Sequence, residues 1–260
     1  MVDAEEAKLH RAVLADPDDH AARLALADWY DANQNPRGEL IRLQLAAAKA
    51  SDPVERARLR EKAYALLDVH RETWLAGKPE YVESTQFRRG FVEMVSLDAA
   101  EFVRHASELY AWAPIRMLVL TAAQASIREL ARAPEVERIV RLVLPDAGLG
   151  DAEVADLMQS PHLRRLKVLE LPRNRIGTAG VEAIAAATSR LPSLVHVNLV
   201  GNPVDNPSER FGEDPFTGVI VRESIALPEL GEQLEAKYGY QAWLHGPSQL
   251  ANWPPSDDDL

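Results

Sequence analysis

The chain has 260 residues, 40 acidic and 29 basic side chains, and a formal net charge of −11. This length allows one large or two modest domains, and a hydrophobic content of 47% is ordinary for a globular protein. The acidity disfavours general nucleic-acid binding, because affinity for phosphates comes mainly from Lys and Arg. Cysteine is absent, which excludes disulfides, thiolate metal sites and thiol nucleophiles.

The sequence shows no feature of a membrane or secreted protein. No apolar run approaches the roughly 18 residues that a membrane-spanning helix needs. The first residues, Met1-Val2-Asp3-Ala4-Glu5-Glu6, are acidic, whereas a secretory signal begins with basic and then apolar residues. We therefore expect a cytoplasmic protein.

Residues 1–80 predict an all-α domain. Helical spacing of apolar residues indicates helices over Ala4–Ala15, His20–Ala32, Glu39–Ala50 and from Pro53 to Trp74. Asp16-Pro17-Asp18-Asp19 and Ser51-Asp52-Pro53 separate them, since Asp caps a helix start and Pro is favoured in its first turn. Gly77-Lys78-Pro79 ends the last helix.

Three stretches of this helical segment resemble the bacterial repeat-companion domain. The resemblance is carried by Asp16-Pro17-Asp18-Asp19, by Arg23-Leu24-Ala25-Leu26-Ala27-Asp28-Trp29-Tyr30 and by Asn35-Pro36-Arg37-Gly38-Glu39-Leu40-Ile41-Arg42-Leu43-Gln44. It implies a short helical module at the N-terminus of a leucine-rich-repeat protein, with no established activity. For Asp28, Trp29, Arg37 and Glu39 we favour a structural role, in which Trp29 packs between helices and Asp28 or Glu39 pairs with Arg37.

A repeated pattern organises residues 81–205. Leu166-x-x-Leu169-x-Leu171-x-x-Asn174-x-Ile176 recurs 28 residues later as Leu194-x-x-Val197-x-Leu199-x-x-Asn202-x-Val204. The leucines are predicted to point inward and stack on the next repeat. The asparagines are predicted to bond backbone groups of neighbouring repeats and so form a ladder.

Weaker copies precede these two repeats. They begin at Ile139, Ile115 and Val92, and Ala replaces Asn in all three. Ordinary strand alternation is the alternative for the earliest copies. Between the strands, helices are predicted over Ala100–Ala111, after Ser126 and after Asp151, with Ser126 and Asp151 as N-caps, and again over Val181–Ala187.

The repeats resemble the ribonuclease-inhibitor-like class of leucine-rich repeats. Long steps, helical returns and Asn174-x-Ile176-Gly177-x-x-Gly180 carry the resemblance. It implies an α/β fold, a leucine-rich-repeat solenoid, which the N-terminal all-α domain is expected to cap. Bacterial leucine-rich-repeat ubiquitin ligases act through a catalytic Cys, which this chain lacks.

Residues 206–260 are expected to form a C-terminal cap and an acidic tail. A short strand is predicted near Thr217–Val221 and a helix near Glu229–Tyr238. Tyr240, Trp243, Leu244 and Trp253 are too apolar for a free tail, whereas residues from Trp253 onward are predicted to be disordered.

The residues between the leucines should point outward from each strand. The third such position of successive strands is Thr121, Pro145, Pro172 and Val200. Because exposed apolar patches mark binding sites, this outward face, expected to be the concave face of the solenoid, is predicted to bind a protein partner. The predicted partner-binding residues are Met117, Val119, Arg141, Val143, Val168, Glu170, His196 and Asn198, with Arg141, Glu170 and His196 providing polar specificity. The alternative is that the C-terminal segment or the helical module covers this face.

No catalytic, cofactor-binding or metal-binding pattern is recognised in the sequence. Phosphate-loop, zinc-protease and serine-hydrolase motifs are absent, and the histidines lack metal-ligand spacing. We therefore expect a non-enzymatic scaffold or adaptor without cofactors. The first alternative is an accessory enzyme with a site near Arg222, Glu223, Tyr238 and His245. The second is nucleic-acid contact through a basic rim of Arg164, Arg165, Lys167, Arg173 and Arg175.

Overall fold

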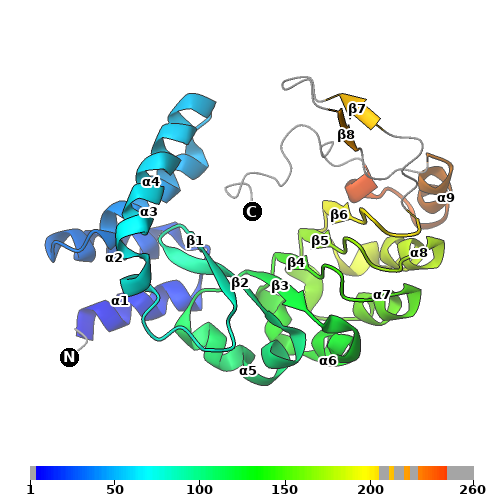
Figure 1. Cartoon of the computed structure of the whole chain (residues 1–260), viewed down its shortest axis with the longest axis horizontal. Coiled ribbons are helices and arrows are strands. Elements are labelled where there is room, and N and C mark those ends of the chain that lie inside the picture. Colours follow the sequence, from blue (N-terminus) through cyan, green and yellow to red (C-terminus); the bar gives the residue numbers. More distant parts are fainter. Residues whose placement is uncertain (1–3, 205–210, 214–219, 223–227, 245–260) are drawn as a thin grey trace. The chain divides into compact units, whose positions relative to one another are not determined.

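The protein is an α/β protein in which four helices precede a six-stranded, mostly parallel sheet that alternates with helices (Figure 1). The computed structural model describes residues 4–204, 211–213, 220–222 and 228–244. The chain divides into two compact units. The N-terminal unit contains the chain up to Val95 and Ser107–Arg116, and the second unit contains Ser96–Ala106 and the described chain from Met117.

Four helices make up most of the N-terminal unit. Their bounds are α1 Ala4–Ala15, α2 His20–Ala32, α3 Arg37–Lys49 and α4 Pro53–Trp74. The carboxylate of Asp19 caps α2 by accepting from the N–H groups of Ala21 and Ala22, and Asp52 caps α4 in the same way. The predicted helices are confirmed, because caps and apolar spacing are local signals that a sequence carries openly.

A β-hairpin completes the N-terminal unit. Strands β1 (Ser84–Arg88) and β2 (Phe91–Asp98) are joined by Arg89 and Gly90, which both have positive φ angles, 47° and 85°. A Cβ atom on Gly90 would lie 2.1 Å from Cγ1 of Ile41, so only glycine fits this turn. The hairpin brings Phe91 into the helical core, where it packs with Val13, Leu26, Ala27, Tyr30, Ile41 and Leu45.

The second unit is a run of strand–turn–helix segments, here called coils. Its strands are β3 Met117–Thr121, β4 Arg141–Val143, β5 Val168–Glu170 and β6 His196–Asn198, and its α-helices after α5 (Ala99–Trp112) are α6 Ile127–Arg132, α7 Asp151–Met158 and α8 Thr178–Ala187. Strands β3 to β6 are parallel and adjacent. The helices of successive coils pack against one another, α6 on α7 and α7 on α8 (Figure 1).

The inward-facing leucines lie in register across the coils. Leu118, Leu142, Leu169 and Val197 are Cα partners in neighbouring strands, and none is more than 4% exposed. Each coil is too small to bury these side chains alone, so the apolar residues of one coil are buried by those of the next. Short 3₁₀ turns complete the coils: η1 Ala123–Ser126, η2 Pro134–Arg138, η3 Leu163–Arg165 and η4 Thr188–Arg190.

In every coil from β3 onward, the residue at one equivalent turn position has a left-handed backbone conformation. Ala122, Asp146, Arg173 and Gly201 have φ angles of 49°, 47°, 54° and 79°, and each precedes the Ala or Asn position of the repeated pattern. β2 has no such turn, because α5 begins directly after it and Asp98 accepts from the N–H of Ala100 (2.7 Å). The weak pattern beginning at Val92 therefore forms a strand without the turn of the later coils.

The asparagine ladder predicted from the sequence is confirmed. The amide oxygen of Asn174 accepts from the N–H of Leu149 (3.0 Å), and its nitrogen donates to the carbonyl of Leu144 (2.8 Å). One coil later, Asn202 bonds Ile176 (3.0 Å) and Leu171 (2.7 Å) in the same way. Both asparagines are buried, so each satisfies backbone groups that water cannot reach.

Two predicted helix caps are wrong. Asp151 is the first residue of α7 rather than its N-cap, and its carboxylate accepts from the N–H groups of Gly177 (2.7 Å) and Gly180 (2.9 Å) at the start of α8. It therefore caps the helix of the next coil. Ser126 occupies the predicted N-cap position of α6, but its side chain forms no capping hydrogen bond. The sequence shows the right residue types, whereas the stacking of coils decides which backbone each one reaches.

The described C-terminal segments follow β6. They are β7 Phe211–Glu213 and β8 Ile220–Arg222, an antiparallel pair, helix α9 Pro228–Tyr238 and the 3₁₀ turn η5 Ala242–Leu244. Helix α9 packs on α8, and η5 packs against β6, as expected of a C-terminal cap. Trp243 is buried, whereas Tyr240 is 70% exposed and does not pack as expected. Trp253 and the predicted tail lie outside the described residues.

No helix in the described ranges combines the length and apolar character that a bilayer crossing demands.

We expect Asn174→Ala to lower the free energy of unfolding by about 2–3 kcal/mol, because a buried backbone group left without a partner costs about 1–3 kcal/mol. Urea denaturation followed by circular dichroism measures this change. Asn198→Ala is the matched control, since half-buried Asn198 bonds the N–H of Val200 two residues away, and it should cost less than about 1 kcal/mol. Equal losses in the two variants would contradict the role of the ladder.

Candidate functional site

The eight predicted partner-binding residues lie together on one face of the sheet. The first row, Met117, Arg141, Val168 and His196, pairs from strand to strand, and so does the second row, Val119, Val143, Glu170 and Asn198. Because side chains alternate along a strand, both rows face away from the inward leucines. We call these two rows the outward face.

The two rows of the outward face differ in how deeply their side chains are buried. Met117, Arg141, Val168 and His196 of the first row are 2%, 9%, 1% and 4% exposed. In the second row Val119, Val143 and Asn198 are half-buried, and Glu170 is 8% exposed. The next outward positions, Thr121, Pro145, Pro172 and Val200, are also half-buried. The accessible part of the face therefore lies at the carboxyl ends of strands β3 to β6, where apolar side chains dominate. We call this part the C-terminal edge of the outward face.

The two charged residues of the outward face bind each other. Nε of Arg141 donates to Oε1 of Glu170 at 2.7 Å, and Nη2 lies 2.6 Å from the same oxygen. Both side chains are about nine-tenths buried, at 11% and 10% exposed. The pair links β4 to β5 and leaves this part of the face without net charge. That Arg141 and Glu170 select a partner stays a prediction.

His196 is the titratable group most affected by this environment. Burial, and then the positive charge of Arg141, lower the pKa of His196 from 6.5 to about 4. Desolvation disfavours the charged imidazolium, and a neighbouring guanidinium disfavours it further. The side chain is therefore neutral at physiological pH.

The basic rim is partly neutralised by contacts within the fold. Arg173 binds Asp146 of the preceding coil through Nε–Oδ1 and Nε–Oδ2 distances of 2.9 and 2.8 Å. Nη2 of Arg175 donates to the carbonyl of Gly148, also one coil earlier, at 2.7 Å. Two of the five cations therefore tie neighbouring coils together, which weakens their case as a phosphate-binding surface.

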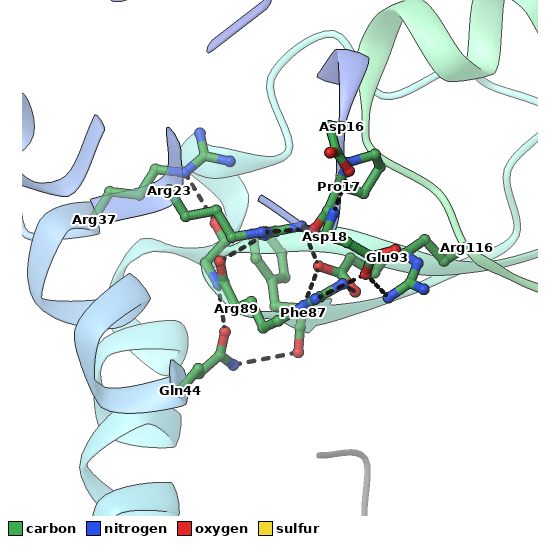
Figure 2. A network of polar contacts seen from close by, with 11 residues as sticks. Asp16, Pro17, Asp18, Arg23, Arg37, Gln44, Phe87, Arg89, Glu93 and Arg116 are labelled. Atoms are coloured by element: carbon green, nitrogen blue, oxygen red, sulfur yellow. Dashed lines mark hydrogen bonds and ion pairs between the residues drawn. The ribbon is translucent and has the colours of Figure 1, made fainter. Parts of the chain in front are cut away.

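A second polar cluster lies within the N-terminal unit, around fully buried Arg23 (Figure 2). Nη2 of Arg23 lies 2.6 Å from Oε1 of Glu93, which is 1% exposed. Its other bonds go to the carbonyls of Pro17 (3.1 and 2.8 Å) and Arg89 (2.9 Å). Arg23 thereby joins the α1–α2 loop to the hairpin turn.

Further charges surround the Arg23–Glu93 pair. Arg89 contacts both oxygens of Glu93, at 2.9 and 2.8 Å. Oδ1 of Asp18 lies 2.7 Å from Nη1 of Arg116 and 3.5 Å from Nη1 of Arg89. Burial lowers the pKa of Arg23 to about 10, opposed by the charge of Glu93. These contacts join the α1–α2 loop, the hairpin and Arg116, so the cluster holds the hairpin to the helices.

The predicted partner of Arg37 is wrong. Nε of Arg37 donates to the carbonyl of Gly90 (3.2 Å), and its guanidinium lies 4.8 Å from the ring centroid of Phe91. Asp28 pairs instead with Arg42, which also binds Asp31 at 3.0 Å. Arg37 is near residues more than fifty positions away, and no sequence spacing reveals that neighbour. Its role remains structural, as expected.

The proposed C-terminal site can be located only in part. The hydroxyl of Tyr238 donates to Oε1 of Glu182 (2.8 Å), which also binds Lys237, so Tyr238 fastens α9 to α8. Glu223 and His245 lie outside the described residues, as does the Arg222 side chain. A search of the described chain finds no group of three or more His, Asp or Glu side chains placed to hold a metal ion.

Comparison with protein-family models, with curated proteins and with solved structures finds no match for this chain.

We expect Glu93→Gln to lower the free energy of unfolding by about 3–5 kcal/mol, because removing one partner of a buried ion pair leaves the other charge uncompensated. Chemical denaturation measures the loss. Asp28→Asn is the matched control, since Asp28 is 72% exposed and its pair with Arg42 should contribute less than about 1 kcal/mol. If Glu93→Gln lowers the free energy of unfolding by less than Asp28→Asn does, the buried ion pair does not hold the hairpin to the helices.

Stability should fall as pH falls from about 6.5 towards 5. His196 and His10 both have pKa values lowered to about 4, each by burial and then by an arginine, Arg141 and Arg37 respectively. In this window the unfolded chain binds protons that the folded chain does not, so acid favours unfolding. Unfolding free energies measured across this pH range should depend less steeply on pH in His196→Gln, and an unchanged slope would contradict the assignment.

Proposed function

We propose that this protein is a non-enzymatic interaction module that binds a protein partner on the C-terminal edge of the outward face. In this proposal the second unit is a leucine-rich-repeat solenoid of the ribonuclease-inhibitor-like class. The helices of the N-terminal unit act as a repeat-companion domain. Each part of the proposal has its own support.

The solenoid assignment is supported by features that recur from coil to coil. Leu166 and Leu194 begin equivalent copies of the repeated pattern 28 residues apart, and the ladder bonds of Asn174 recur at Asn202. Left-handed turns occupy the same position in four successive coils. Recurrence of one structural unit along the chain is typical of repeat architectures.

The observation that carries the binding proposal is the apolar edge of the outward face. Val119 and Val143 are paired across β3 and β4, and together with Pro145 and Pro172 they are half-buried rather than core. The charges beside them, Arg141 with Glu170 and Asp146 with Arg173, are paired internally. An apolar strip without free charge suits a protein interface better than a phosphate or an ionic substrate.

Hydrogen bonds between neighbouring coils hold the C-terminal edge of the outward face rigid, which favours its use in binding a partner. Backbone bonds continue past the short strands, from Leu144 N–H to Glu170 C=O (2.8 Å) and from Leu171 N–H to Asn198 C=O (2.8 Å). The edge residues are thus held by the coil-to-coil network and need little ordering when a partner binds. Less ordering means that less of the interaction free energy is lost on association.

Val143→Asp should weaken partner binding at least tenfold, because a carboxylate placed in an apolar contact loses hydration without gaining a counter-charge. Partners captured from a lysate with the unaltered chain would be identified, purified and titrated by calorimetry against both proteins. Val195→Asp is the matched control, since Val195 is 46% exposed and is not one of the outward-face residues.

Three outcomes are informative. Loss of binding in Val143→Asp with retained binding in Val195→Asp supports the proposal, provided both variants unfold like the parent. Unchanged binding in Val143→Asp would place the partner elsewhere. Binding that falls steeply with salt and follows Arg164 and Arg165 would favour the basic rim instead.

A further inference from the structure

Helix α4 exposes large apolar side chains. Val54, Tyr64 and Val69 are 76%, 60% and 74% exposed, and they are three of the five exposed large apolar residues in the described part of the chain. Of the 22 residues of α4, only Ala63 and Leu67 are buried. The helix packs on α3, so this contact uses one narrow face and leaves the rest of α4 accessible.

Four charged residues of α4 share one side of the helix with Val69. Arg58 and Lys62 lie in the N-terminal half of α4. Asp68 and Glu72 lie in its C-terminal half, and all four residues are exposed. At about 3.6 residues per turn, these side chains project from roughly one third of the circumference of the helix. The charge of these four residues therefore changes sign along the helix.

We infer that two copies of the chain associate through this side of α4, with the helices packed antiparallel about a twofold axis at exposed Ala65. Residues equally far from Ala65 in the two directions then lie opposite each other. Arg58 precedes Ala65 by seven residues and faces Glu72 of the second copy, which follows it by seven. Lys62 and Asp68 are each three residues from Ala65 and face each other in the same way. Twofold symmetry repeats both contacts.

The charges favour a second copy in the antiparallel direction. In a parallel pair each residue lies beside its own copy, so Arg58 would face Arg58 and be repelled. In the antiparallel pair the small side chain of Ala65 lies where the helices cross, which permits close approach. Glu61, the acidic residue on this side in the N-terminal half, is four residues from Ala65 and faces Val69 rather than another carboxylate.

Arg58 remains able to bind the second copy although it already has an internal partner. Its Nε and Nη2 donate to the carboxylate of Glu55 at 2.8 and 2.7 Å. A guanidinium has five N–H donors, so it can also bind Glu72 of the second copy. The bond to Glu55 holds the guanidinium close to the helix surface before association.

The association is expected to be weak. Exposed ion pairs contribute little individually, and one helix pair forms a small interface. We therefore expect a dissociation constant in the micromolar range that rises with salt concentration, because salt screens exposed charges.

The association goes beyond the proposed function, since α4 belongs to the N-terminal unit and the outward face to the second unit. A dimer carries two outward faces, so it binds more tightly to a partner that offers two epitopes. Val143→Asp should leave the dissociation constant of the dimer unchanged. Either proposal can therefore fail without the other.

Charge reversal with the full chain tests the pairing, with the dissociation constant measured by analytical ultracentrifugation. Arg58→Glu with Lys62→Glu makes all four facing residues acidic, and Asp68→Lys with Glu72→Lys makes them all basic. Each double variant alone should dimerise at least tenfold more weakly, because like charges then lie opposite each other. An equimolar mixture of the two variants should recover dimers, since every facing pair is again of opposite charge.

The matched control is Lys8→Glu with Arg104→Glu. It changes the net charge as much as Arg58→Glu with Lys62→Glu does, at exposed residues of α1 and α5, and it should leave the dimer unchanged. A parent chain that stays monomeric at millimolar concentration would overturn the inference. A dimer that resists both reversals, or that the mixture fails to restore, would also overturn it.

The absence of cysteine allows a test of direction. Ala65→Cys places one thiol at the twofold axis, so two copies should form a disulfide under mild oxidation. Val54→Cys is the control on the same side of the helix, because its two copies lie about 33 Å apart in the antiparallel pair, far beyond disulfide reach. Ala65→Cys should cross-link at least tenfold faster, whereas equal rates would overturn the antiparallel arrangement.

Discussion

The fold of the second unit depends on one constraint: a coil buries its apolar side chains only against the neighbouring coils. Leu142 and Leu169 are in register because their strands pair directly, and Asn174 bonds the backbone of the coil before it. A shift of one residue would turn the leucines to the outward face and break the amide bonds together. Hydrophobic burial and hydrogen bonding therefore specify the same register.

The buried and cross-coil charges follow the same logic in both units. Glu93 neutralises Arg23 and Arg89, Glu170 neutralises Arg141, and Asp146 neutralises Arg173. Buried ion pairs contribute little net stability, because desolvation offsets much of their attraction. Three of these four pairs, Glu93 with Arg23, Glu170 with Arg141 and Asp146 with Arg173, connect segments far apart in the sequence, whereas Glu93 and Arg89 lie in one hairpin. Their role is to fix which segments meet.

This distribution of charge leaves apolar surface as the feature available for recognition. The outward face combines a buried first row with a half-buried edge that includes Val119 and Val143.

The sequence by itself determined the helices, the strands from β2 to β6, the coil spacing and the asparagine ladder, whereas β1 (Ser84–Arg88) was not predicted. These follow from periodicity and from residue types whose partners lie one coil away in a repeated pattern. It also placed the eight outward residues on one face, because alternation along a strand is a local property. Only the tertiary structure decided that Arg37 reaches Gly90 and Phe91, that Asp151 caps the next helix and that the first outward row is buried. Those outcomes depend on which distant segments pack together, and no local spacing encodes that choice.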